Sequence, residues 1–566
     1  MIRIAFAIAA LWFSSVLPAT SAAPADTIFH GGTIITVDDG LPTAEAVAVA
    51  NGRIVAVGTT LEVFKLQGAT TKLIDLAGKT LVPGFVDGHS HFMSCIDFLR
   101  QANCWSPPAG TCQSVADVIA ALGEQAARNG AKPGEFIVGF GYDPELLHEK
   151  RGPSRAELDA AFPDNPVIVI HVSAHGATLN SKALAHYGIT ALTPTPPGGV
   201  IGRQTGSQEP DGVLFETALL PVFAGIPGPT PDEMLALLPE GQKLYLAAGV
   251  TTAQEGATNK NQLDLLRAAA DRGLLELDVV ALPFVTDFDA IFGSGVPPKL
   301  ERAYRNRLRI GGVKILSDGS PQAKTAFFTK PYLTGGPAGE KEWRGEPTFT
   351  PGEIAEFVKR VYAGDAPLFM HCNGDAAIDA LLEAHRAAAG DDPSRDRGTV
   401  AVHAQFIRPD QLQKFLAWKI TPSFYTEHCF YFGDTHVKNR GRQQADSISP
   451  MKSALRLGMH PANHTDFNVA PIDQINTIST AVNRRTRSGM ILGEGERVTP
   501  IEALRAITLD GARLYGEETQ KGSIAIEKLA DLVILSANPL VVPPETINEI
   551  TVEETIKEGK TVWKRP

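Results

Sequence analysis

The chain has 566 residues, of which 43% are hydrophobic and 20% are charged, the composition of an ordinary globular protein. Its formal net charge of −11 argues against nucleic acid or an anionic membrane surface as the main partner. At this length we expect a large core and more than one structural unit.

The first 23 residues have the pattern of a secretory signal peptide. Arg3 supplies a positive charge, residues 4–17 are nearly all apolar, and small residues dominate positions 18–23. The apolar run is short for a membrane-spanning helix. We therefore expect residues 1–23 to be removed and the mature protein to be periplasmic or secreted, without membrane attachment. An uncleaved membrane anchor is the alternative.

Both ends of the mature chain contain short strand patterns separated by turns. Apolar runs of this kind recur between residues 27 and 80, where the Asn51-Gly52 pair is typical of a hairpin turn. Similar runs recur after residue 520. We predict one small composite β-sandwich built from residues 24–80 and 520–566.

The middle of the chain, residues 81–519, alternates short apolar runs with helical patterns. The candidate core strands begin near Leu81, Gly249, Leu277, Gly311, Pro367, Thr399, Ile420 and Met459. Eight strands that alternate with helices indicate a closed parallel barrel, in which the chemistry lies at the carboxyl ends of the strands. We predict an α/β fold with a (β/α)8 TIM barrel at its centre.

A long interval, residues 95–245, separates the first two core strands. It contains strand patterns of its own at 135–139 and 167–170, so we predict an inserted α/β subdomain that caps the barrel mouth. Cys104 and Cys112 flank a turn-rich loop within this insertion. Because an exported protein folds under oxidising conditions, we predict that these two cysteines form a disulfide.

Histidines follow three of the predicted strands. His89 and His91 come after the first strand, and residues two apart in a strand point to the same face. His371 and His403 each end a later apolar run. A lone His at a strand end is more often structural, but this succession after an HxH pair favours a site for Zn²⁺ or a neighbouring transition metal.

Asp466 follows the eighth strand and is a candidate metal ligand that could also take a proton from a bound water. The alternative is a helix cap or an Asx turn, where Asp is common. His464, two residues earlier, is expected to support a ligand or to contact the substrate.

Lys314 ends a short apolar run, and an unpaired ammonium is costly to bury. One solution is carbamylation by CO₂, which would give an anionic bridge between two metals and requires an un-ionised amine. The others are an ion pair with Asp318 or direct contact with the substrate.

Taken together, these segments resemble the amidohydrolase superfamily, specifically its amidohydrolase-3 branch, which includes N-substituted formamide deformylases. The resemblance covers nearly the whole mature chain and rests on residues 83–91, 175–184, 313–320, 371–379, 402–405, 521–524, 529–533 and the Asp466 segment. Two segments depart from the branch: Asn463-His464-Thr465 before Asp466, and the residues on either side of His403. These departures affect the surroundings of the ligands and leave each ligand in place.

The resemblance implies a metal-bearing barrel that hydrolyses C–N bonds of amide-like small molecules. It implies His89, His91, His371, His403 and Asp466 as ligands of one or two divalent metals, with zinc the expected ion and Lys314 added if it is carbamylated. Asp466 would act as general base and then as general acid, beside a metal-activated water. We expect His175, Asn180 and His464 to contact the substrate, while Asn180 could instead cap the helix that begins near Lys182.

Two other functions remain open from the sequence. The same metal barrel could catalyse lactone or ester hydrolysis, hydration or isomerisation, because one fold supports many reactions. A non-catalytic exported binding protein is the third option, and the intact ligand set argues against it. We expect a small-molecule substrate and no nucleic acid, with a homodimer as one option for the assembly.

Overall fold

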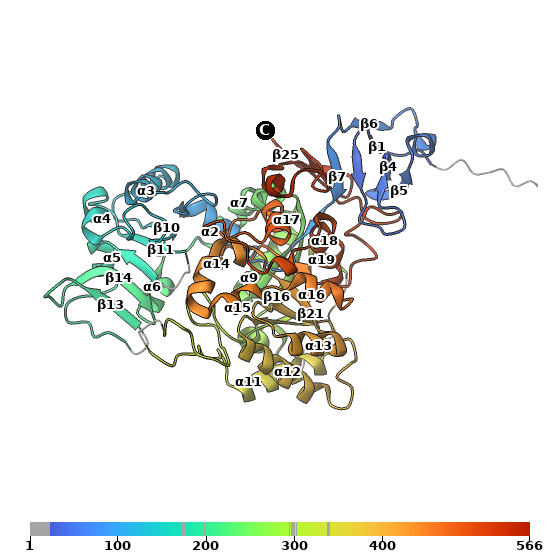
Figure 1. Cartoon of the computed structure of the whole chain (residues 1–566). Coiled ribbons are helices and arrows are strands. Elements are labelled where there is room, and N and C mark those ends of the chain that lie inside the picture. Colours follow the sequence, from blue (N-terminus) through green and yellow to red (C-terminus); the bar gives the residue numbers. More distant parts are fainter. Residues whose placement is uncertain are drawn as a thin grey trace, which may run out of the picture.

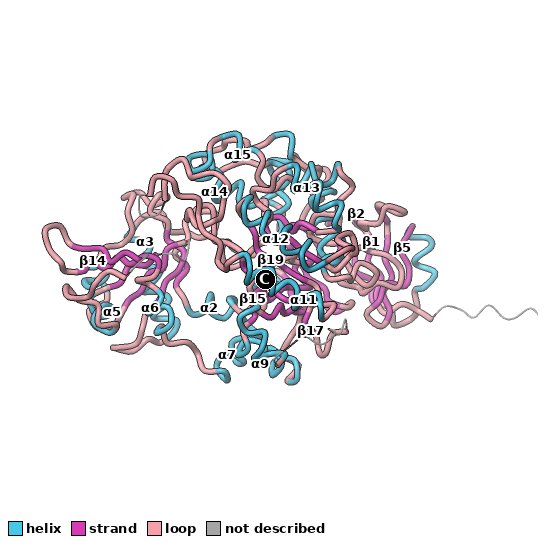
Figure 2. The backbone as a smooth tube through the Cα atoms, turned by 90° about the horizontal axis from the view of Figure 1, so that it is seen from below, coloured by secondary structure: helices cyan, strands magenta, loops and turns pink. Residues whose placement is uncertain are grey.

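The computed structural model describes residues 23–566 except 173–175, 197–198, 294, 296–299, 301–302 and 337–339. The predicted signal peptide therefore lies almost wholly outside the described residues, and so does His175. Figures 1 and 2 show three regions in a row: a lobe formed by residues of the predicted insertion, a large helix-rich body, and small sheets at the other end. Among the described residues, no helix is both long enough and apolar enough to span a membrane.

The body is built on two parallel sheets that contain the predicted core strands. One sheet has the order β17-β16-β15-β8, and the other has the order β18-β19-β20-β21-β22. Their bounds are β8 (Phe85–Val86), β15 (Val250–Thr258), β16 (Asp278–Pro283), β17 (Leu308–Ile310), β18 (Val313–Leu316), β19 (Leu368–Cys372), β20 (Thr399–His403), β21 (Thr421–Phe424) and β22 (Ala462–Asn463).

The two sheets meet edge to edge without forming one continuous ladder. Phe284 and Lys314 form an isolated parallel bridge just beyond β16. At the other edge, the Asp466 N–H donates to the His89 carbonyl at 3.1 Å, and the His91 N–H donates to the Phe467 carbonyl at 2.7 Å. The α/β fold is confirmed, and strand pairing leaves the predicted barrel incompletely closed.

Helices cover these sheets, and several begin at strong capping signals. The Thr350 side chain accepts the Glu353 N–H before α11, and Asn259 and Gln262 form the same capping box before α9. The main helices of the body are α7 (Pro231–Gly241), α8 (Lys243–Ala247), α9 (Lys260–Asp271), α11 (Pro351–Ala363), α12 (Asp375–Ala389), α13 (Pro409–Trp418), α14 (Glu427–Arg440), α16 (Met451–Arg456), α17 (Gln474–Asn483), α18 (Pro500–Ala506) and α19 (Leu509–Leu514).

The insertion leaves the body after β8 through α2 (Ser94–Arg100) and forms its own mixed sheet, in the order β13-β14-β12-β11-β10-β9. Its strands are β9 (Ala102–Asn103), β10 (Ile137–Tyr142), β11 (Val167–His171), β12 (Gly176–Leu179), β13 (Gly199–Arg203) and β14 (Pro210–Glu216). Its helices are α3 (Val115–Asn129), α4 (Arg155–Ala161) and α5 (Ser181–His186). A separate apolar cluster packs against each face of this sheet.

The predicted Cys104–Cys112 disulfide is not present. Both side chains are buried free thiols in the apolar cluster beneath α3. The Cys104 Sγ lies 3.6 Å from the Ala102 carbonyl, and the Cys112 Sγ lies 3.7 Å from the Asn103 carbonyl. The prediction was wrong because sequence spacing does not tell whether two thiols point toward each other.

The two ends of the chain meet in one sheet. The six-stranded sheet has the order β25-β24-β23-β7-β2-β3, and a four-stranded sheet, β5-β4-β1-β6, packs nearby through a shared apolar cluster. The first sheet consists of β2 (Thr33–Ile35), β3 (Thr43–Ala44), β7 (Thr80–Pro83), β23 (Leu532–Leu535), β24 (Val552–Lys557) and β25 (Lys560–Lys564). The second consists of β1 (Thr27–His30), β4 (Ala46–Ala50), β5 (Arg53–Gly58) and β6 (Lys72–Asp75).

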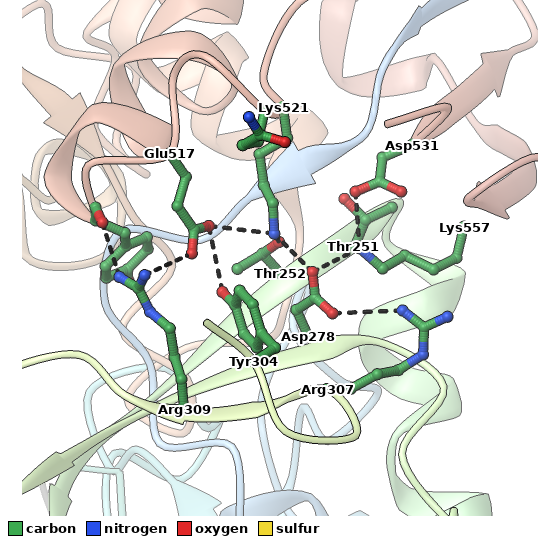
Figure 3. A network of polar contacts seen from close by, with 12 residues as sticks. Thr251, Thr252, Asp278, Tyr304, Arg307, Arg309, Glu517, Lys521, Asp531 and Lys557 are labelled. Carbon is green, nitrogen blue, oxygen red and sulfur yellow. Dashed lines mark hydrogen bonds and ion pairs between the residues drawn. The ribbon is translucent and has the colours of Figure 1, made fainter. Parts of the chain in front are cut away.

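A buried network of ion pairs joins this C-terminal sheet to the body (Figure 3). Asp278, at the start of β16, lies 2.6 Å from the Lys521 Nζ and 2.7 Å from the Lys557 Nζ. Lys557 also lies 2.7 Å from Asp531. Because these charges are almost completely buried, each depends on its partners to offset the cost of leaving water.

Candidate metal centre

The predicted ligands converge at the carboxyl ends of the parallel strands. His89 and His91 follow β8, His403 is the last residue of β20, and Asp466 follows β22. Lys314 lies within β18 and His371 within β19, and these two strands are neighbours in the sheet. The parallel arrangement therefore brings together residues that are hundreds of positions apart in the sequence.

Two groups of side chains offer ligand atoms close enough to hold a metal ion. One group is His89, His91 and Asp466, and the other is His403, His464 and Asp466. Within each group the ligand atoms all lie within 4.8 Å of one another. The two groups share the Asp466 carboxylate, and their nitrogen-rich composition suits Zn²⁺.

The histidines of both groups are held in the neutral form. Burial lowers the pKa of His91 to about 4, and burial also lowers the pKa values of His89, His403 and His464 well below the usual value. A neutral imidazole keeps a free lone pair on one ring nitrogen, which is the form that binds a cation. The donor set therefore fits a divalent metal.

Lys314 lies inside this centre. Its Nζ is 3.1 Å from the His89 Nε2, and the residue is only 2% exposed. Burial lowers the Lys314 pKa to about 7, against the opposing pull of the Asp466 carboxylate. Burial likewise raises the pKa of Asp466 to about 7, and Lys314 opposes that rise.

The Lys314–Asp318 ion pair, which the sequence left open, is not formed. Asp318 is fully buried and accepts backbone N–H groups from Phe327, Asn373 and Gly374 at 2.8–3.0 Å. Asp318 thus orders the loops after β18 and β19, while Lys314 faces His89.

Gln254, in the middle of β15, orients His89. Its amide nitrogen donates to the Gly88 carbonyl at 3.1 Å and to the Tyr515 hydroxyl at 2.8 Å. The Gln254 Oε1 therefore faces the His89 Nδ1, at 2.5 Å, and must accept a hydrogen from it. The lone pair of His89 is then on Nε2, which faces Lys314 and Asp466.

The Asp466 segment is held by a second buried carboxylate. The Thr465 hydroxyl donates to Asp87 at 2.6 Å, and the Thr465 N–H donates to the same carboxylate at 3.1 Å. Asp466 itself has a φ of 52°, a left-handed conformation that Asp tolerates better than most residues. This tight turn brings Asp466 beside His89, with 3.5 Å between its Oδ1 and the His89 Nε2.

His464, predicted to support a ligand or contact the substrate, lies within the second ligand group. Its Nε2 is 3.0 Å from the His403 Nδ1, and its Nδ1 is 2.9 Å from the Ser423 hydroxyl. It stacks on Tyr425, with ring centroids 5.5 Å apart. The His464-x-Asp466 spacing repeats the i, i+2 pattern of the first HxH pair, a signal that could have indicated a ligand role for His464.

Of the predicted histidine and amide site residues that the structure describes, His371 and Asn180 belong to neither ligand group. The His371 Nε2 faces the Gly319 carbonyl at 3.2 Å, although its ring lies 4.6 Å from that of His403. Asn180 accepts the Ala183 N–H and caps α5, which favours the capping alternative. His175 is outside the described residues.

Sequence reasoning missed several residues beside the centre. Glu255 forms an isolated bridge with His91 and accepts the Met93 N–H at 2.6 Å; burial raises its pKa to about 8. His428 is 2% exposed and its Nδ1 makes no hydrogen bond to any described residue. Gln254 and Glu255 follow the apolar run at the start of β15, a position that could have singled them out, whereas the place of His428 on α14 follows no pattern.

The chain is similar to known proteins over almost its whole length. A sequence profile described as the amidohydrolase family matches residues 72–563. An N-substituted formamide deformylase of Arthrobacter pascens is 28% identical over 95% of this chain and 98% of its own length. The protein LONG AFTER FAR-RED 3 of Arabidopsis thaliana is 30% identical over 91% of this chain and 88% of its own. A crystal structure of an uncharacterised metal-dependent hydrolase from Pyrococcus furiosus has a TM-score of 0.71 at 25% identity, covering 91% of this chain and 99% of that one.

Proposed function

The chain belongs to the amidohydrolase family, and from that premise we propose that it hydrolyses a C–N bond of a small amide-type molecule at a divalent metal centre. The observation that carries this proposal is the pair of ligand groups that share Asp466 at the carboxyl ends of parallel strands. The nitrogen-rich donor set supports zinc. The similarity to a formamide deformylase supports N-substituted formamides as the first substrates to test.

In this proposal the residues of the centre have separate roles in the reaction. A cation bound by these ligands would polarise the scissile carbonyl and acidify a water molecule to a pKa of ~7. Asp466, which belongs to both ligand groups, would take the proton from that water and release it to the leaving nitrogen. Gln254 and Thr465 keep His89 and Asp466 in position for these roles.

Lys314 fits the proposal as a site of carbamylation. Burial lowers its pKa to about 7, so a large fraction of the amine is un-ionised near neutral pH. The neutral nitrogen can attack CO₂ and lose one proton, which leaves an anionic carbamate among the histidines. That anion would add oxygen ligands at the position where the lysine now lies 3.1 Å from His89.

Elemental analysis of the wild type and of Lys314→Ala, side by side, tests the centre itself. Two metals per chain, falling to one or fewer in the variant, would support a carbamylated bridge. One metal in both proteins would reject the bridge and leave Lys314 as a substrate contact. No metal in the wild type after purification with added Zn²⁺ would reject the hydrolase proposal.

Turnover tests the reaction class. We expect the zinc-loaded protein to release formate from N-benzylformamide, and chelation followed by zinc addition to abolish and restore this activity. Benzyl formate and a series of lactones serve as the matched oxygen substrates. Turnover of the ester and lactones without turnover of any amide would assign a different reaction to the same centre.

A further inference from the structure

A continuous series of polar contacts runs from the ion-pair network of Figure 3 to the candidate metal ligand His89. On the side of the network, the series begins at Arg309 of β17, whose Nη1 lies 2.9 Å from the Glu517 Oε1. Glu517 lies 3.1 Å from the Lys521 Nζ, and Lys521 reaches Asp278. Arg309 is 7% exposed, so its charge depends on these partners.

Tyr515 is the next residue in the series. The Arg309 Nη2 donates to the Tyr515 backbone carbonyl at 2.7 Å, directly after the end of α19. A cation at this place satisfies a carbonyl that the helix leaves without a partner and suits the negative end of the helix dipole. The contact therefore ties the end of α19, which carries the Tyr515 ring, to β17.

The Tyr515 side chain extends into the apolar interior of the body. It belongs to one buried cluster with Val280 of β16, Phe369 of β19 and Val402 of β20. Its ring stacks on that of Phe369, with centroids 6.0 Å apart. Because water is excluded from this cluster, the few polar groups that meet the Tyr515 hydroxyl decide how it is oriented.

The Tyr515 hydroxyl makes two hydrogen bonds of opposite sense. It donates its hydrogen to the Asp87 backbone carbonyl at 2.9 Å, so toward Gln254 it can only accept. The Gln254 amide nitrogen lies 2.8 Å away and supplies that hydrogen. The amide oxygen of Gln254 is then the atom that faces the His89 Nδ1, at 2.5 Å.

The orientation of this amide decides which nitrogen of His89 can bind a cation. With the amide oxygen toward Nδ1, the imidazole carries its hydrogen there and keeps a lone pair on Nε2, which faces Asp466. With the amide nitrogen toward Nδ1, the hydrogen would move to Nε2. His89 could then no longer offer Nε2 to a metal shared with Asp466.

Arg307 shows what a purely structural cation of the network does. It lies just before β17, 3.3 Å from Asp278 and 2.9 Å from Glu558. Within the described part of the chain, no hydrogen bond or ion pair joins it to Tyr515. Arg309 differs from Arg307, because one of its donors connects the network to the residue that orients Gln254.

We propose that Arg309 and Tyr515 are positioning residues of the candidate metal centre, which together hold the Gln254 amide in the orientation that His89 requires. The inference rests on the metal centre of the proposed function and adds the contacts that determine its affinity. It links an ion-pair network at the start of β16 to ligands at the carboxyl ends of the parallel strands.

The test measures zinc affinity by competition with a chromophoric chelator, and ligand geometry by the visible spectrum of the cobalt-substituted protein. Tyr515→Phe keeps the ring and removes the hydroxyl. Its zinc affinity should fall roughly 2- to 12-fold, the value of one ordinary hydrogen bond, and its cobalt spectrum should change. Arg309→Lys keeps the charge beside Glu517 and removes the fork that also reaches Tyr515. We expect a loss in the same direction, of roughly 2- to 10-fold.

Arg307→Lys is the matched control, since it alters the same network at a residue that does not reach Tyr515. Its zinc affinity and cobalt spectrum should equal those of the wild type. An equal loss of affinity in Arg307→Lys would show that weakening the network lowers metal binding in general, and would overturn the roles of Arg309 and Tyr515.

A double-mutant cycle tests whether the effect passes through Gln254. In a Gln254→Leu background, Tyr515→Phe and Arg309→Lys should cause little further loss of zinc affinity, because the amide that they orient is absent. A full additive loss in that background would overturn the proposed series of contacts.

Crystal structures of the metal-free wild type and of Tyr515→Phe separate this inference from the proposed reaction. We expect the His89 ring to lose its single orientation in the variant. If the wild type binds no zinc but His89 turns in the variant, the positioning role stands and the hydrolase proposal fails. Equal zinc affinity in the wild type, Tyr515→Phe and Arg309→Lys would overturn the positioning role and leave the hydrolase proposal intact.

Discussion

Gln254 shows how one uncharged side chain can decide the chemistry of a ligand. Its amide nitrogen is committed to Gly88 and Tyr515, so only its oxygen can face His89. The Tyr515 hydroxyl in turn donates to the Asp87 carbonyl at 2.9 Å, which fixes the direction of the whole chain of bonds. His89 is therefore held as the tautomer with its free lone pair toward Asp466 and Lys314.

Replacing Gln254 should weaken the metal centre without touching a ligand. Gln254→Leu removes the acceptor for the His89 Nδ1–H, and we expect zinc affinity to fall roughly 10- to 100-fold. Gln254→Glu keeps an acceptor at that position and should retain most of the affinity. Competition with a chromophoric chelator measures both. Wild-type affinity in the leucine variant would show that Gln254 does not hold His89.

The burial of His436 should make the stability of the folded chain depend on pH. Burial lowers its pKa to about 3, whereas an unfolded histidine titrates near 6.5. Below pH ~6.5 the unfolded chain therefore binds a proton that the folded chain does not. The stability of the fold decreases as the pH is lowered from ~6.5 to about 3, where the folded histidine is protonated as well. Between pH ~7.5 and ~5.5 this residue should cost about 1.4 kcal/mol of stability.

Urea unfolding of the wild type and of His436→Gln at both pH values checks this expectation. The variant should lose less stability on acidification, by the amount that His436 contributes. The Gln405 side chain, 2.8 Å from the His436 Nε2, remains available to bond with the introduced amide. An identical pH dependence in both proteins would show that His436 does not resist protonation in the fold.

At the scale of elements, the C-terminal sheet and the body are joined by charge as well as by apolar packing. Lys557 belongs to β24, Asp278 begins β16, and Lys521 lies in the segment between α19 and β23 (Figure 3). Both lysines converge on one Asp278 oxygen, at 2.6 and 2.7 Å. Their attraction holds the Asp278 pKa well below its ordinary value despite burial.

Asp278→Asn should be strongly destabilising, because it leaves two buried ammonium groups short of a partner. We expect a loss of about 3–5 kcal/mol, the range for breaking a buried pair. Asp365→Asn breaks an exposed pair with Arg395 and should leave the unfolding midpoint nearly unchanged. Denaturant unfolding followed by circular dichroism compares the two. Equal small effects would mean that water or a rearranged partner replaces Asp278.

At the scale of the whole molecule, zinc binding and folding should be coupled through Asp466. Ligands from β8, β20 and β22 come together only in the folded chain, so zinc should stabilise it by about 2.7 kcal/mol at 100 times its Kd. Asp466→Asn weakens both groups at once and should lose most of this increment. Thermal unfolding with and without zinc measures it. The same increment in the variant would place the zinc elsewhere.

Local patterns account for much of the architecture. Short apolar runs predicted most of the core strands, but the run at Leu81 lies in β7 of the terminal sheet and β17 was not predicted. The period of a strand and the position of a strand end can be read locally, and on that basis the HxH pair and the strand-end histidines indicated the region of the candidate metal centre. The meeting of both chain ends in one sheet also follows from their similar strand patterns. The family resemblance added the expected reaction class.

Only the tertiary structure decided which residues share a site. His464 lies with His403 and Asp466, whereas the His371 Nε2 faces a loop. Asn180 caps a helix, and Cys104 and Cys112 are separate thiols. The tertiary structure also revealed Gln254 beside His89. These outcomes depend on side-chain direction and on contacts between distant strands. The sequence by itself determined the order of strands and the kinds of ligand, because those depend on local period and chemistry.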